Sequence, residues 1–138
     1  MSGDRTSLRL PSRIEAVNEA AASVARILND LGTSEDINFG VDMAVREAVT
    51  NAVLHGNKQD ESKSVDLQIT TSLEAIEILV HDQGVGFTPE DVPDPTAAEN
   101  IMKTSGRGIF FMRNFMDEVD WLIQPKGGTT VRLMKRLS

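Results

Sequence analysis

Three polar side chains stand four residues apart within an otherwise apolar segment, at Glu47, Asn51 and His55. Residues with this spacing share one face of an α-helix, and three alanines with the same spacing lie beside them. A polar row is often only the solvent-exposed face of a helix. The apolar neighbours here leave room only for a narrow exposed face, so a polar row that lines a pocket is the better interpretation. A carboxylate there can orient or deprotonate a hydroxyl group, and an amide oxygen can bind Mg²⁺ together with substrate phosphates.

A second candidate site is the sequence DQGVGF at residues 82–87, which follows an apolar alternation typical of a buried strand. Gly84 and Gly86 permit backbone conformations closed to other residues and allow a ligand to approach the chain closely. Asp82, directly before them, is a natural hydrogen-bond acceptor. A tight turn would explain this motif equally well if it stood alone.

Two more glycine-containing segments could contact a ligand. Gly106 and Gly108 flank Arg107 where a helix is predicted to begin, and the free N–H groups of a helix N-terminus suit a phosphate. The sequence GGTT at residues 127–130 is predicted to form the turn of a hairpin. A flexible helix start and a bare turn are the structural alternatives. The sequence contains neither the P-loop pattern nor a Rossmann glycine pattern after a strand.

Helical periodicity places the polar row on the second of two helices. Apolar residues three and four apart predict a first helix that begins at Ser12, with Glu15 in the capping-box position, and ends at Gly32. A second helix is predicted to begin within residues 34–36, where acidic residues suit its positive end. It carries the polar row and ends at Gly56.

Alternating apolar residues predict the strands that accompany these helices. A short strand that ends at Pro11, two strands joined by a turn and a final hairpin are expected at residues 8–10, 65–69, 76–80, 119–124 and 129–133.

The segment between the two pairs of strands has a different character. Residues 88–105 contain three prolines and little apolar periodicity, which is typical of an active-site lid. A third helix should follow, with Ile109, Met112 and Phe115 on one face. This order of elements predicts an α+β fold: a two-layer sandwich of a mixed, largely antiparallel sheet covered on one face by about three helices. We expect a single domain at residues 1–138.

Composition narrows the function further. The chain has 138 residues, 14 Lys and Arg against 21 Asp and Glu, a net charge of −7 and no cysteine. Thiol catalysis and Cys-ligated zinc are excluded, and the acidity argues against direct binding to nucleic acid. Neither a signal peptide nor a membrane span is visible in the sequence, so a cytoplasmic location without membrane contact is expected.

In their order and spacing, the four motifs resemble those of the GHKL ATPase superfamily, and within it the small anti-sigma-factor serine/threonine kinases. The likeness extends from Leu8 to about Lys135. REAVTNAVLHG at residues 46–56 resembles the N box, and DQGVGF resembles the first glycine box. SGRG at 105–108 resembles the second glycine box, and GTTV at 128–131 the closing motif. The resemblance implies a Bergerat-type ATP site between the helices and a lid at about residues 88–105.

The resemblance also implies roles for the residues of the first two motifs. Asn51 would hold the Mg²⁺ that bridges the ATP phosphates, and Glu47 would act as the base toward the attacking hydroxyl or position it. Asp82 would accept a hydrogen bond from the adenine amino group, beside Gly84 and Gly86. His55 matches a histidine that is common in the N box.

In the other two motifs, Gly106 and Gly108 would bring backbone N–H groups to the phosphates. Either Thr129 or Thr130 would support the adenine side. Some sporulation-type members carry an arginine where Thr104 stands here. The nearby cations Lys103 and Arg107 are the alternatives for contact with the phosphates.

The function implied by the resemblance is that of an ATP-dependent serine/threonine kinase and anti-sigma factor. Its substrate would be an anti-sigma-factor antagonist, its second partner a sigma factor, and its assembly a homodimer. The alternative is a nucleotide-gated binding module that sequesters a partner without physiological kinase activity. A sensor histidine kinase is disfavoured because neither His55 nor His81 lies on a separate helical hairpin. GHKL chaperones and topoisomerases need further domains.

Overall fold

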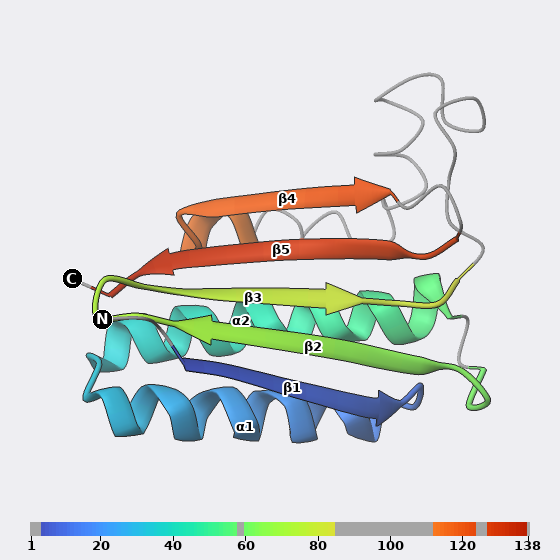
Figure 1. Ribbon diagram of the computed structural model, residues 1–138, viewed down its shortest axis with the longest axis horizontal. Coiled ribbons are helices and arrows are strands. Elements are labelled where there is room, and N and C mark those ends of the chain that lie inside the picture. The colour runs from blue at the N-terminus through green and yellow to red at the C-terminus, as the bar shows by residue number, and fades with distance from the viewer. Residues whose placement is uncertain (1–3, 58–59, 85–111, 124–126, 138) are drawn as a thin grey trace.

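The computed structural model describes residues 4–57, 60–84, 112–123 and 127–137. Five strands form one sheet in the order β1-β2-β3-β5-β4, and each neighbouring pair is antiparallel (Figure 1). The strands are β1 (Asp4–Pro11), β2 (Ser64–Thr71), β3 (Ala75–His81), β4 (Glu118–Ile123) and β5 (Thr129–Arg136). The predicted α+β class is confirmed, and the described sheet is antiparallel throughout rather than mixed.

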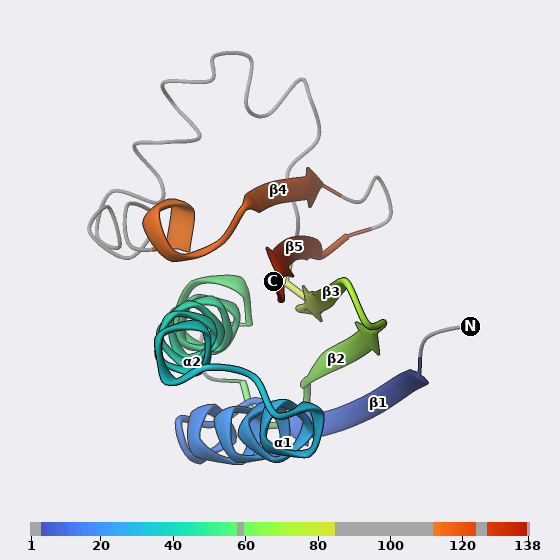
Figure 2. The same ribbon diagram turned by 90° about the vertical axis from the view of Figure 1, so that its left-hand side faces the viewer.

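Two helices cover one face of this sheet. They are α1 (Glu15–Leu31) and α2 (Glu35–Asn51), and α2 continues as the π-helical segment η1 (Ala52–Gly56). Figure 2 shows both helices on one side of the sheet and the opposite face open. Residues 112–115 form a helical turn on the same side as α2, and this turn is the described part of the predicted third helix. The two-layer arrangement expected from the sequence is therefore present.

The core lies between the helices and the sheet. Strands β2 and β3 alternate buried and half-buried positions along their length, as a sheet with one covered face requires. Alanine and valine dominate the buried positions of the helices, and these small side chains allow helix and sheet to approach closely. The largest fully buried side chains are Leu28, Leu67, Ile69, Ile76, Ile78, Met112 and Leu133.

The ends of the helices agree with the sequence at two positions and differ at a third. Gly32 ends α1 in the left-handed conformation with φ 70°, and Ser34 caps α2 by accepting a hydrogen bond from the N–H of Ile37 at 3.3 Å. The predicted N-cap role of Ser12 is wrong, because α1 has Ile14 in the N-cap position and no side-chain cap.

The cause of this difference is the pairing at the C-terminal end of β1. The strand pairs with β2 from Asp4 opposite Thr71 to Pro11 opposite Ser64, well beyond the predicted residues 8–10. Ser12 therefore still belongs to the sheet layer, where its N–H donates to the carbonyl oxygen of Lys63 at 3.1 Å. Its buried hydroxyl has no partner among the described residues.

Among the described helices, none is long and apolar enough to span a bilayer. The predicted lid at residues 88–105 lies outside the described residues.

Candidate functional site

Three segments that are distant in the sequence meet at one end of the sheet. They are η1 at the end of α2, the residues that follow β3, and the residues that begin β5 (right-hand end in Figure 1). Asp82 joins two of them directly, because its N–H donates to the carbonyl oxygen of Thr129 at 3.0 Å. The described start of the first glycine box, the closing motif and the end of the N box therefore lie side by side.

The carboxylate of Asp82 is held in one orientation. Its side chain is buried, and its Oδ1 accepts hydrogen bonds from the N–H groups of Gly84 at 3.0 Å and Thr129 at 3.1 Å. Burial raises the pKa of Asp82, while these two hydrogen bonds act in the opposite direction by favouring the ionised form. Both bonds end on Oδ1, whereas Oδ2 lies against Gly56 and receives no hydrogen bond from the described residues.

Three glycines make the close contact between these segments possible. A Cβ at Gly56 would collide with the carboxylate of Asp82, and one at Gly84 would collide with the carbonyl oxygen of Gly56. Gly128 has φ +88°, and a Cβ there would strike the carbonyl oxygen of Asp82. The sequence predicts Gly56 as the end of a helix and of the N-box motif. In the structure it also makes room for Asp82.

Glu47 and Asn51 lie one turn apart on α2, as their spacing predicts. Asn51 is 7% exposed, and neither its Oδ1 nor its Nδ2 has a hydrogen-bond partner among the described residues. A buried polar group without a partner costs roughly 1–3 kcal/mol. Asn51 is the last residue of α2, one turn beyond the half-buried carboxylate of Glu47. An unpaired buried amide in this position is typical of a residue that binds a ligand.

The polar row does not continue regularly beyond Asn51. Residues 52–56 form a π-helical turn, a feature that is frequent at functional sites. The prediction that His55 would lie at the i+8 position assumed an uninterrupted α-helix, and the π turn changes that register. The side chain of His55 lies outside the described residues.

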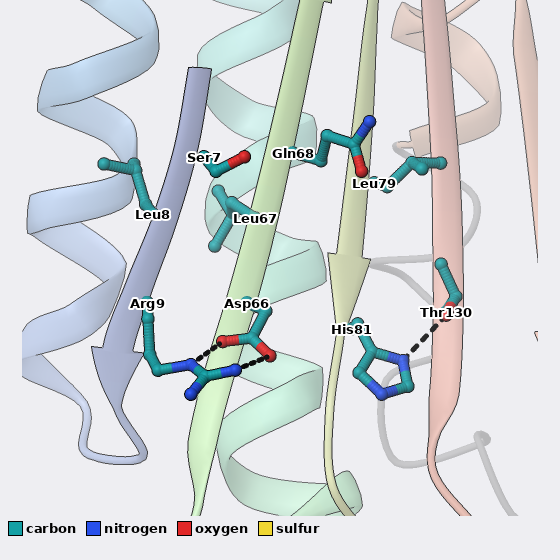
Figure 3. Close-up of a pocket in the computed structure, with 9 residues that line it drawn as sticks. All are labelled: Ser7, Leu8, Arg9, Asp66, Leu67, Gln68, Leu79, His81 and Thr130. Atoms are coloured by element: carbon teal, nitrogen blue, oxygen red, sulfur yellow. Dashed lines mark hydrogen bonds and ion pairs between the residues drawn. The ribbon is translucent and has the colours of Figure 1, made fainter. Parts of the chain in front are cut away.

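The register of β5 distinguishes Thr129 from Thr130. Thr130 lies on the open face of the sheet, where its Oγ1 is 2.8 Å from Nδ1 of His81 (Figure 3). Side chains alternate along a strand, so Thr129 shares the helix-facing side with the core residues Val131 and Leu133. Of the two threonines, Thr129 is therefore the one beside Asp82.

The open face also carries a hollow of about 460 Å³. Its walls include Arg9 and Asp66, which form an ion pair at 2.9 Å, together with His81 and Thr130 (Figure 3). It lies on the side of the sheet opposite to the helices, whereas the carboxylate of Asp82 faces Gly56 at the end of the helical layer. The hollow is therefore separate from the candidate site.

Two residues near Asp82 were missed in the sequence. Asn57 is 1% exposed, and its Oδ1 accepts a hydrogen bond from the N–H of Gln83 at 2.7 Å. Gln83 in turn accepts a bond from the N–H of Ser64. Their partners are backbone groups of distant segments, so the only local signal is their position beside two recognised motifs.

The remaining predicted site residues lie outside the described part of the chain. They are Gly86, Gly106, Arg107 and Gly108.

The described residues include no group of three or more His, Asp or Glu side chains that could hold a metal ion by themselves. A Mg²⁺ ion bound through one or two protein oxygens and the phosphates of a substrate requires no such group. The unpaired amide of Asn51 fits that kind of site, and the acceptor at Asp82 fits a ligand that carries an amino group.

Comparison with known proteins shows the family of this chain. The family described as histidine kinase-like ATPase domain matches residues 10–135. The anti-sigma F factor of Bacillus subtilis is 33% identical over 121 residues, covering 86% of this chain and 83% of that protein. The anti-sigma F factor of Geobacillus kaustophilus is 32% identical over 133 residues, covering 95% and 91%.

A solved structure has a similar fold. The crystal structure of the RsbU and RsbW domains of a Mycobacterium tuberculosis protein superimposes with a TM-score of 0.70 at 19% sequence identity. The match covers 97% of this chain and 32% of the other, so the chain spans about a third of that longer protein.

Proposed function

Because the chain belongs to the histidine kinase-like (GHKL) ATPase family, in its anti-sigma-factor group, we propose that it is an ATP-dependent protein serine/threonine kinase that acts as an anti-sigma factor. An ATPase domain binds ATP, so the proposal concerns what the chain does with it. The observation that carries it is the buried, unpaired amide of Asn51 one turn beyond the carboxylate of Glu47.

This pair matches the demands of phosphoryl transfer. Catalysis of this reaction consists mainly of positioning the reactants and stabilising charge. Bound Mg²⁺ would neutralise charge on the ATP phosphates, and the Oδ1 of Asn51 would serve as its protein ligand. Glu47 would accept a hydrogen bond from the attacking hydroxyl group and orient it, or take its proton.

The adenine end of the nucleotide would lie at Asp82. Its Oδ2 is an acceptor in a fixed position, suited to the amino group of adenine, and Thr129 lies beside it on the helix-facing side of β5. The close packing of Gly56 and Gly84 against this carboxylate keeps water from one side of it. An adenine nucleotide would thus extend from the ends of β3 and β5 toward α2.

The nucleotide contacts proposed for the residues on either side of the predicted lid are inferred from the resemblance of the motifs. Gly86 would form part of the adenine wall, the N–H groups of Gly106 and Gly108 would approach the phosphates, and Arg107 would supply positive charge there.

The partners follow from the names of the relatives. Anti-sigma F factors are named for the sigma factor they oppose, and we infer that this chain likewise binds a sigma factor. The protein substrate would be an anti-sigma-factor antagonist that presents a serine or threonine hydroxyl. We also expect a homodimer, as the resemblance implies.

The test is transfer of labelled phosphate from ATP to the antagonist in the presence of Mg²⁺. Glu47→Gln keeps the size of the side chain and removes its basicity, so transfer should fall by at least about 100-fold, the lower range for a general base. ATP affinity should stay near that of the wild type.

Glu74→Gln is the matched control. Glu74 is exposed in the turn between β2 and β3, at the opposite end of the sheet, and this variant should transfer phosphate normally. Full transfer by Glu47→Gln would refute the assigned role. Tight ATP binding without transfer by the wild type would instead favour the nucleotide-gated binding module.

A further inference from the structure

Asn57 links two segments of the candidate site through its side chain. It follows η1 directly, and its own N–H donates to the carbonyl oxygen of Ala52 at 2.8 Å. Its Oδ1 accepts from the N–H of Gln83 at 2.7 Å, and its Nδ2 donates to the carbonyl oxygen of Ser64 at 2.9 Å. Both polar atoms of this buried amide are therefore paired, in contrast to those of Asn51.

Gln83 completes a closed set of hydrogen bonds. Its side chain is exposed, yet its Oε1 accepts from the N–H of Ser64 at 2.8 Å. Asn57, Ser64 and Gln83 thus join the end of η1, the start of β2 and the loop after β3. Gln83 is also the residue between Asp82 and Gly84, so this set of bonds fixes the loop that carries the carboxylate.

We propose that Asn57 and Gln83 are positioning residues of the nucleotide site, which hold the loop of residues 82–84 so that Oδ2 of Asp82 faces the base. The role rests on the proposed recognition of adenine by Asp82. The pairing of β3 with its neighbours ends at His81, and the N–H of Gln83 lies beyond the ladder. The bonds to Asn57 and Ser64 therefore replace the ladder at the point where the site requires a fixed backbone.

The proposal predicts an effect on the base and little effect on the phosphates. ITP carries an oxygen acceptor where ATP carries an amino donor, and the two nucleotides have identical phosphates. A well-placed acceptor at Asp82 favours ATP over ITP. If the loop loosens, the ratio of the two affinities should move toward one, whereas a general loss of folded protein would weaken both equally.

The decisive variant is Gln83→Leu, which removes the acceptor for Ser64 at an exposed position where the fold should tolerate the change. A hydrogen bond of this kind contributes about 0.5–1.5 kcal/mol, so ATP affinity should fall roughly 2- to 12-fold, with a smaller loss for ITP. Gln83→Glu retains an acceptor oxygen and should restore the wild-type ratio.

Gln68→Leu is the matched control, since Gln68 undergoes the same chemical change on the open face of β2. Affinities for ATP and ITP are measured by titration calorimetry well below the melting temperature of each variant, with circular dichroism to confirm folding. A smaller ATP/ITP ratio in Gln83→Leu alone supports the proposal.

Two results would overturn it: an unchanged ratio of ATP to ITP affinity in Gln83→Leu, whether or not both affinities fall, or failure of Gln83→Glu to keep the wild-type ratio. A wild-type chain that binds neither nucleotide would refute the proposed function itself, and this role with it. A wild type that binds ATP but transfers no phosphate would leave the test of Gln83 intact, because the test measures binding only.

Discussion

Replacement of Asp82 by asparagine should turn the base-facing atom of the site from an acceptor into a donor. The N–H groups of Gly84 and Thr129 both point at Oδ1, and only an oxygen can accept them. The asparagine must therefore place its carbonyl oxygen there. Its NH₂ group then takes the position of Oδ2, where it would face the amino group of adenine.

The size of the effect follows from the bond that is lost. A hydrogen bond to a charged group contributes about 1.5–3 kcal/mol, so ATP affinity should fall roughly 12- to 140-fold. ITP offers an oxygen to the new NH₂ group, and its affinity should be retained or increased. Because the two side chains have nearly the same shape, packing against Gly56 should persist.

The stability of the ligand-free protein should change in the opposite direction. Burial raises the pKa of Asp82 above its ordinary value of 3.8, so the folded state binds a proton more readily than the unfolded state does. The ionised carboxylate therefore opposes folding above the raised pKa, and this cost disappears as the pH falls below 3.8. Asp82→Asn should be at least as stable as the wild type at pH 7.5, with the difference lost in acid.

Titration calorimetry with ATP and ITP measures the first effect, and thermal unfolding across the pH range measures the second. If Asp82→Asn binds ATP as tightly as the wild type, Oδ2 of Asp82 does not contact the base. If the variant loses affinity for both nucleotides equally, the carboxylate supports the fold and does not recognise the base.

Other substitutions test the remaining parts of the site. Asn51→Leu removes a buried unpaired amide, so it should raise the free energy of unfolding by about 1–3 kcal/mol. The variant should also lose the increase in melting temperature that Mg²⁺ and ATP cause. A lower free energy of unfolding in urea titration would contradict the first expectation. Gly56→Ala should cost about 1–3 kcal/mol and weaken ATP binding, because its Cβ meets Asp82; normal affinity would show that the segments can separate freely. Thr129→Val should weaken ATP binding in calorimetry. Thr130→Val should lower the free energy of unfolding by about 0.5–1.5 kcal/mol and leave ATP binding unchanged. If Thr130→Val weakens ATP binding and Thr129→Val does not, Thr130 is the threonine at the base.

Periodicity alone predicted most of the fold. The helices over Glu15–Leu31 and Glu35–Asn51 and the alternation in β2 and β3 follow from local spacing of apolar residues. The start of the first helix could not be predicted in this way. Ser12 has a good capping sequence, but pairing of β1 with β2, more than fifty residues away, holds it in the sheet layer.

The site was less accessible to local reasoning. Spacing predicted that Glu47 and Asn51 are neighbours on one helix face, but only the resemblance of the motifs linked that helix to Asp82. The structure makes the link at Gly56, which packs against the Asp82 carboxylate, and no local sequence pattern indicates this contact. The choice between Thr129 and Thr130 required the register of β5 against β3. Within the described part of the chain, the side chain of Asn57 bonds to backbone groups of two distant segments, which no sequence pattern indicates.

Two polar groups of the site are buried at a cost in stability, so the surrounding structure must hold them in place. Asn51 is buried without a partner, and Asp82 is buried beside a glycine that makes room for it. Each of these features opposes folding of the ligand-free protein, as is common where activity requires groups that stability does not. A bound nucleotide would supply the missing partners, and saturation at 100 times its dissociation constant would add about 2.7 kcal/mol of stability. Until then the antiparallel sheet and the hydrogen bonds that join Asn57, Ser64 and Gln83 hold the loop that carries Asp82.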